Sequence, residues 1–140
     1  MGTIVVGYVP KPEGDAALRR AAEEAQLRGS RLVVVNSHRG GREFDRDDAV
    51  ESESALDEVS RELTAAGVEH EIRQLVRGLD PADDLVAVAE ELAAEFIVIG
   101  LRRRSPVGKL ILGSNAQRVL LDAPCPVLAV KADADADAAD

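Results

Sequence analysis

Hydrophobic residues along this chain form short continuous runs, separated by longer segments in which they recur every three or four residues. The short runs predict strands that are buried on both faces. The longer segments predict amphipathic helices, because that spacing places apolar side chains on one face of a helix. The predicted strands are 3–8, 31–36, 68–76, 96–100 and 126–131, and the predicted helices are 15–28, 48–66, 81–92 and 114–121.

This alternation of strand and helix indicates an α/β fold. Strands separated by helices pair in parallel through right-handed crossovers, so a doubly wound open sheet with helices on both faces is expected. Residues 68–76 differ from the other strands, since apolar and charged positions alternate there, and this pattern indicates a half-exposed edge strand. Ligands of such sheets bind beyond the carboxyl ends of the strands, where the strand order reverses.

The composition agrees with one globular domain and narrows the function. The chain has 140 residues and a formal net charge of −9, which argues against general binding to nucleic acid. No apolar run is long enough to span a membrane. The chain has a single cysteine, Cys125, which favours a location in the cytoplasm. We expect Cys125 to be a small, buried side chain. Residues 132–140 are an acidic Ala/Asp repeat that we expect to be a disordered tail outside a domain of residues 1–131.

Candidate chemistry concentrates between Gly100 and Ser114, after a buried strand and before a helix. The span 97–121 holds no Asp or Glu but several basic residues, including Arg102, Arg103 and Arg118. Three features of this segment are suited to binding phosphate: free N–H groups at the start of the helix, a glycine that lets a ligand approach the backbone, and the Ser114 hydroxyl. The structural alternative is that Gly113 permits a tight turn and Ser114 caps the helix.

Familiar catalytic patterns are missing. The Gly108-Lys109 pair is followed by leucine, so the Walker A pattern fails, and neither a dinucleotide-binding glycine pattern nor a nucleophile elbow is present. The single cysteine and the two histidines are not spaced as metal ligands usually are. We predict that His38 is a solvated loop residue and that His70 is structural. No catalytic or metal-binding residue is therefore assigned.

The chain resembles the universal stress protein family. The family signature G-x2-G-x9-G-[ST] reads here as Gly100, Arg103, Gly113 and Ser114, and the segments 76–81 and 122–130 are also typical of the family. The resemblance implies a stress-response regulator with a five-stranded sheet of order 3-2-1-4-5. It also implies a homodimer paired through residues 126–131 and, in many members, bound ATP, with or without magnesium.

Carried onto this chain, the resemblance places the phosphates at Gly100, Gly113, Ser114 and Asn115, and the base near Val9 and Asn36. The Asn36 side chain has two interpretations, a hydrogen bond to the adenine edge or a contact that satisfies the strand end.

Two departures from the family pattern bear on the ligand. Arg103 replaces the second signature glycine and either fills the phosphate space or pairs with the phosphate. Val9 stands where ATP-binding members commonly have an aspartate. Three functions therefore remain open: a nucleotide-binding regulator, a dimeric interaction module without nucleotide, and a slow ATPase or phosphotransferase. For the third function, an ATPase or phosphotransferase, Asp80 is the carboxylate nearest to the Gly100–Ser114 segment. We interpret Asp80, however, as a helix N-cap.

Overall fold

The computed structural model describes residues 2–38, 46–76, 80–102 and 113–132. Strands and helices alternate along the chain as the hydrophobic pattern predicts. The elements are β1 (Thr3–Gly7), α1 (Pro12–Arg28), β2 (Arg31–His38), α2 (Arg46–Ala65), β3 (His70–Val76), α3 (Pro81–Glu91), β4 (Phe96–Leu101), α4 (Ser114–Asp122) and β5 (Val127–Lys131).

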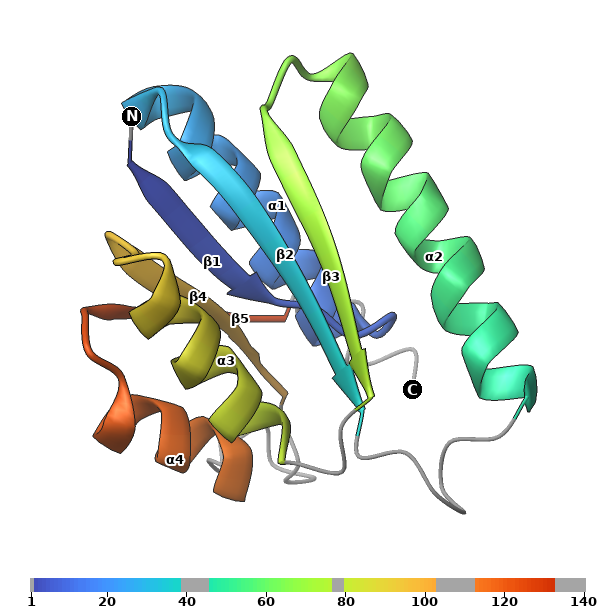
Figure 1. The fold of residues 1–140 in the computed structure, drawn as a ribbon. Coiled ribbons are helices and arrows are strands. Elements are labelled where there is room, and N and C mark those ends of the chain that lie inside the picture. The colour runs from blue at the N-terminus through green and yellow to red at the C-terminus, as the bar shows by residue number, and fades with distance from the viewer. Residues whose placement is uncertain (1, 39–45, 77–79, 103–112, 133–140) are drawn as a thin grey trace.

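The five strands form one parallel sheet in the order β3-β2-β1-β4-β5, which confirms the expected topology (Figure 1). From β1 the chain builds outward to β2 and β3, then returns to the other side of β1 to add β4 and β5. The strand order therefore reverses between β1 and β4. β3 is an edge strand, as the alternation of residues 68–76 predicts.

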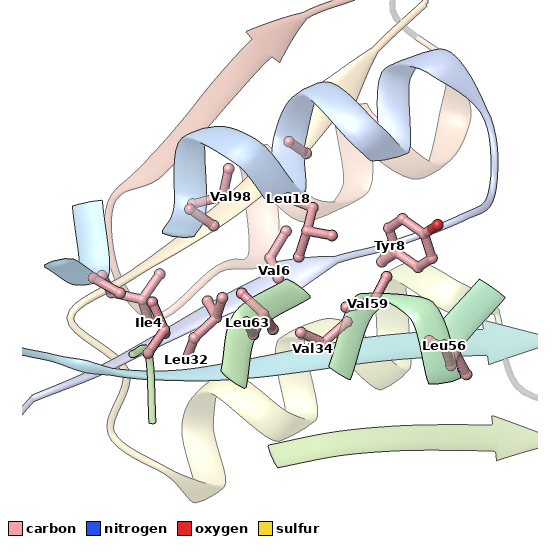
Figure 2. Packing of buried hydrophobic residues seen from close by; sticks show 14 of the residues in the cluster. Ile4, Val6, Tyr8, Leu18, Leu32, Val34, Leu56, Val59, Leu63 and Val98 are labelled. Carbon is pink, nitrogen blue, oxygen red and sulfur yellow. The ribbon is translucent and has the colours of Figure 1, made fainter. Parts of the chain in front are cut away.

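Two apolar cores fill the space on either side of the sheet. Alternate residues of β1 divide between them: Val6 packs with α1 and α2, and Val5 packs with α3 and α4. Figure 2 shows the first core, in which aliphatic side chains of α1 and α2 meet those of β1 and β2. The sheet is thus covered by two helices on each face, and its central strands are buried on both sides, as their continuous apolar runs predict.

Several element boundaries differ from the sequence prediction. α1 begins three residues earlier than expected, at Pro12, because proline suits the first turn of a helix, where its missing N–H is not needed. β2 extends through His38, so the interpretation of that residue as part of a loop is wrong. Gly29 ends α1 in the left-handed conformation, at φ 65°, as predicted.

The side chains of His70 and Cys125 contact other parts of the domain. His70 lies within hydrogen-bond distance of the Val68 carbonyl (2.9 Å, from Nδ1) and of the Ser60 hydroxyl (3.1 Å, from Nε2), which confirms its structural role. Cys125 is half-buried against the second core rather than fully buried, and burial raises the pKa of its thiol.

Ala132 is the first residue of the predicted tail and is in contact with the sheet. It is 3% exposed, and its N–H donates to the Leu101 carbonyl (3.2 Å). The rest of the predicted tail, 133–140, lies outside the described residues, as does Arg103. Within the described ranges, no helix combines the length and apolar character that crossing a membrane requires.

Candidate functional site

A pocket of about 220 Å³ opens at the carboxyl ends of the central strands, where the strand order reverses. Its walls come from the ends of β1, β2 and β4 and from the first turns of α1, α3 and α4. Val35, Leu85 and Ile99 are among its apolar lining residues. The pocket therefore occupies the position at which open α/β sheets bind their ligands.

Two helix N-termini at the pocket offer free backbone donors. Ala82 of α3 and Asn115 and Ala116 of α4 line the cavity and carry backbone N–H groups, whereas Pro81, which also lines it, has none. Neither N-cap residue, Asp80 nor Gly113, makes a side-chain capping hydrogen bond. Backbone N–H groups in the first turn of a helix have no partner within the helix, and the positive end of the helix dipole favours an anion beside them.

Gly100 has a structural function that the sequence interpretation missed. Its backbone lines the pocket, but a Cβ at this position would lie 2.0 Å from the Glu13 carbonyl oxygen. The missing side chain therefore makes room for the start of α1 and not only for a ligand. Gly14 is constrained similarly, since its Cβ would lie 1.8 Å from the Val9 carbonyl oxygen.

The structure divides the residues that the sequence analysis assigned to the site. Gly100, Val9 and Asn115 line the pocket, whereas Gly113 and Ser114 are not among the lining residues. Gly113 is the N-cap of α4 and Ser114 its first helical residue, so the expectation that Ser114 caps the helix is wrong.

Asn36 also lies outside the pocket. It is fully buried, and its Nδ2 donates to the Tyr8 carbonyl (2.9 Å). Of its two interpretations, the structure favours the one in which the side chain satisfies a strand end.

Asp80 is the N-cap of α3, as predicted, but its side chain contacts a residue of α4. It accepts a hydrogen bond from Nη1 of Arg118 (2.5 Å), and Asp83 lies 3.5 Å from the same nitrogen. These carboxylates raise the pKa of Arg118, chiefly through the hydrogen bond from Asp80. The positive charge of Arg118, which the sequence analysis counted among the basic residues of the span 97–121, is therefore paired with carboxylates of α3.

A buried carboxylate beside the pocket escaped the sequence analysis. Asp84 is 1% exposed, its Oδ2 accepts a hydrogen bond from the Ser37 hydroxyl (2.5 Å), and its Oδ1 has no hydrogen-bond partner. Ser37 itself lines the pocket. A signal was available, since Asp84 stands three residues after Pro81 and four before Val88, on the buried face of the helix.

Tyr8 is the only tyrosine of the chain, so its ionisation can be measured without interference from other tyrosines. It is 5% exposed and its pKa is raised to about 12, first by burial and then by Asp15, Glu58 and Glu62. Absorbance of tyrosinate should therefore show a midpoint near pH 12 in the folded chain and near the ordinary 10.0 in denaturant.

The raised pKa links the ionisation of Tyr8 to folding. The folded state favours the neutral phenol, so its contribution to stability is complete below pH 10 and is lost as the pH rises toward 12. A midpoint near pH 10 in the folded chain would contradict the burial of Tyr8 beside these carboxylates.

The fold and the pocket together define a class, the doubly wound α/β domains with a cavity at the topological switch point. The model of the universal stress protein family matches residues 1–131. The chain therefore belongs to the universal stress protein family, and the resemblance noted in the sequence is confirmed.

Relatives match the chain over nearly its whole length. A universal stress protein of Mycolicibacterium smegmatis is 46% identical over 128 residues, which are 91% of this chain and 96% of that protein. One from Thermus aquaticus is 34% identical, covering 92% of this chain and 98% of that protein. The structure of a universal stress protein from Archaeoglobus fulgidus is 42% identical, with a TM-score of 0.79, and the match covers 94% of this chain and 99% of that one.

Proposed function

We propose that this universal stress protein binds an adenine nucleotide in the pocket between the ends of β1 and β4 and acts as a regulator in a stress response. The pocket's position at the switch point, with two helix N-termini in its wall, carries the proposal. Its apolar walls suit a purine base, and the uncapped first turns of α3 and α4 suit an anionic group.

A relative supports the choice of an adenine nucleotide. The structure of a universal stress protein from Archaeoglobus fulgidus in complex with dAMP is 36% identical to this chain, with a TM-score of 0.73. The match covers 94% of this chain and 98% of that one. Equivalent binding here would place the ligand in a cavity of about 220 Å³, below the roughly 300–1,000 Å³ of pockets that enclose drug-sized ligands. The base and sugar would therefore occupy the cavity, with the phosphate nearer its mouth.

The proposal extends to ATP, which the family resemblance implies, and to magnesium on its phosphates. The part of the chain that the structure describes contains no group of three or more His, Cys, Asp or Glu side chains arranged to hold a metal ion. Magnesium would therefore bind mainly through the nucleotide phosphates, as this ion commonly does. Val9 supplies no carboxylate at the pocket, but Glu13 lines it and has a buried Oε2 without a hydrogen-bond partner. Glu13 and the Ser37 hydroxyl would therefore be among the polar side chains that meet the nucleotide, together with backbone groups and apolar contacts.

Isothermal titration of the whole chain with AMP, dAMP and ATP, with and without magnesium, tests the proposal. We expect saturable binding with a Kd below about 1 mM for at least one of them. Ala116→Phe, which places a ring in the pocket, should weaken that binding about tenfold or more, because the ring occupies space that the ligand needs.

Leu121→Phe is the matched control, since Leu121 lies on the same helix, is 83% exposed and is not among the pocket's lining residues. Thermal unfolding of both variants verifies that they are folded. No heat with any adenine nucleotide would contradict the proposal and favour the second candidate, a dimeric interaction module without nucleotide.

The homodimer and the cytoplasmic location belong to the same proposal. β5 is an edge strand that pairs with β4 alone in this sheet, and its apolar residues are half-buried or exposed. An unpaired edge of this kind favours pairing with another strand, here the β5 of a second copy. Sedimentation at micromolar concentration should show a dimer, and a monomer would contradict this pairing.

A further inference from the structure

A second cavity lies between α1 and α2 on the opposite face of the sheet and shares only Tyr8 with the first pocket among the described lining residues. It is a groove of about 700 Å³ whose apolar lining includes Leu18 and Ala22 of α1 and Val59 and Leu63 of α2. Figure 2 shows Leu18, Val59 and Leu63 together over the first core, with Tyr8 beside them. The three aliphatic side chains are 3–7% exposed, so they form an apolar floor between the two helices.

Both sides of this groove are acidic. Asp15 and Glu23 line it from α1, and Glu58 and Glu62 line it from α2. All four side chains are exposed. Arg19 is the only basic residue among those that the structure describes along the groove. Tyr8 also lines the groove, and its pKa is raised first by burial and then by the carboxylates of Asp15, Glu58 and Glu62.

The dimensions of the groove indicate the kind of partner. The lining residues run from 15 to 26 on α1 and from 55 to 63 on α2, and Ala66, just after the end of α2, also lines the groove. Eleven residues of helix extend about 16 Å, which is about three helical turns. A groove of this length with an apolar floor and charged sides is suited to an amphipathic helix, whose apolar face lies on the floor while its flanks meet the rims.

We propose that the α1–α2 groove binds a basic amphipathic helix of a partner protein, with Lys or Arg side chains opposite Glu58 and Glu62 and aliphatic side chains against Leu18 and Val59. Charge complementarity selects this occupant, because the rims are anionic. A second copy of the chain fits poorly, since its own groove-facing helices are acidic and its net charge is −9. The proposal does not depend on nucleotide binding.

A fluorescein-labelled helical peptide of 14 residues provides the probe, with leucines at i, i+3, i+7 and i+10 and lysines on both flanks. Anisotropy at low salt should show saturable binding to the whole chain that weakens as salt is added. The double variant Glu58→Gln/Glu62→Gln should bind the peptide about three- to tenfold more weakly, because two rim charges are lost. A peptide with serine in place of the leucines should bind about tenfold more weakly or not at all.

The control is Glu90→Gln/Asp122→Asn, which makes the same change in net charge at exposed positions on α3 and α4. This variant should bind the peptide within about twofold of the unmodified chain. Equal weakening in both double variants would overturn the proposal, since only net charge would then act. Equal binding of the serine and leucine peptides, or no saturable binding at millimolar peptide, would also overturn it. Thermal unfolding of each variant confirms folding.

Discussion

Replacing Gly100 by alanine should lower the free energy of unfolding by about 3 kcal/mol. The new Cβ would lie 2.0 Å from the Glu13 carbonyl oxygen and 2.6 Å from its carbonyl carbon, and both belong to the backbone. Backbone cannot rotate away as a side-chain tip can, so the first turn of α1 must move from the end of β4. Urea unfolding followed by far-UV circular dichroism measures the loss.

Gly7→Ala is the matched control, because Gly7 also lines the pocket at a strand end. Its Cβ would meet the Leu85 Cδ2 atom at 3.1 Å, the end of a side chain that can adjust. We expect this variant to lose about 1 kcal/mol. Equal stability of Gly100→Ala and the unmodified chain would show that Gly100 is not needed for the approach of α1 to β4.

Replacing Ser37 by alanine should destabilise the chain by about 3 kcal/mol, because Asp84 loses its hydrogen-bond donor. Asp84 is almost completely buried at the start of α3, and its other carboxyl oxygen already has no partner. Removing the hydroxyl leaves the carboxyl group without the bond that offsets its burial. The same denaturation experiment detects this loss.

A double-mutant cycle separates this effect from a simple loss of packing. Asp84→Ala alone and the combination with Ser37→Ala complete the cycle. If the hydrogen bond is the cause, Ser37→Ala should cost much less once Asp84 is absent, with a coupling of about 2 kcal/mol. Additive losses would show that the two side chains contribute independently.

The sequence was sufficient to predict the fold because the relevant signals are local and repeated. Continuous apolar runs marked the central strands, and alternation at residues 68–76 marked the edge strand. The strand order came from the family resemblance and not from the pattern of residues, since alternation alone leaves the order open. The start of α1 was placed too late, since Pro12 reads equally well as a loop residue or as the first residue of a helix.

The site was less predictable because its contacts join residues far apart in the chain. Ser37 and Asp84 are 47 positions apart, and Asp80 and Arg118 are 38 apart. Gly100 could be identified as special, but its closest neighbour, Glu13, became visible only in three dimensions. Asn36 shows the same limit, since a polar residue at a strand end predicts a hydrogen bond without naming its partner.

Tyr8 lines both the proposed nucleotide pocket and the α1–α2 groove, so the two cavities share one residue at the end of β1. Two ligands that contact this residue are thermodynamically linked when binding of one changes the position of Tyr8 that the other meets. Any factor by which a nucleotide changes the affinity for a helix must equal the factor by which the helix changes the affinity for the nucleotide. Tyr8 is therefore the residue through which binding on one face of the sheet would alter binding on the other.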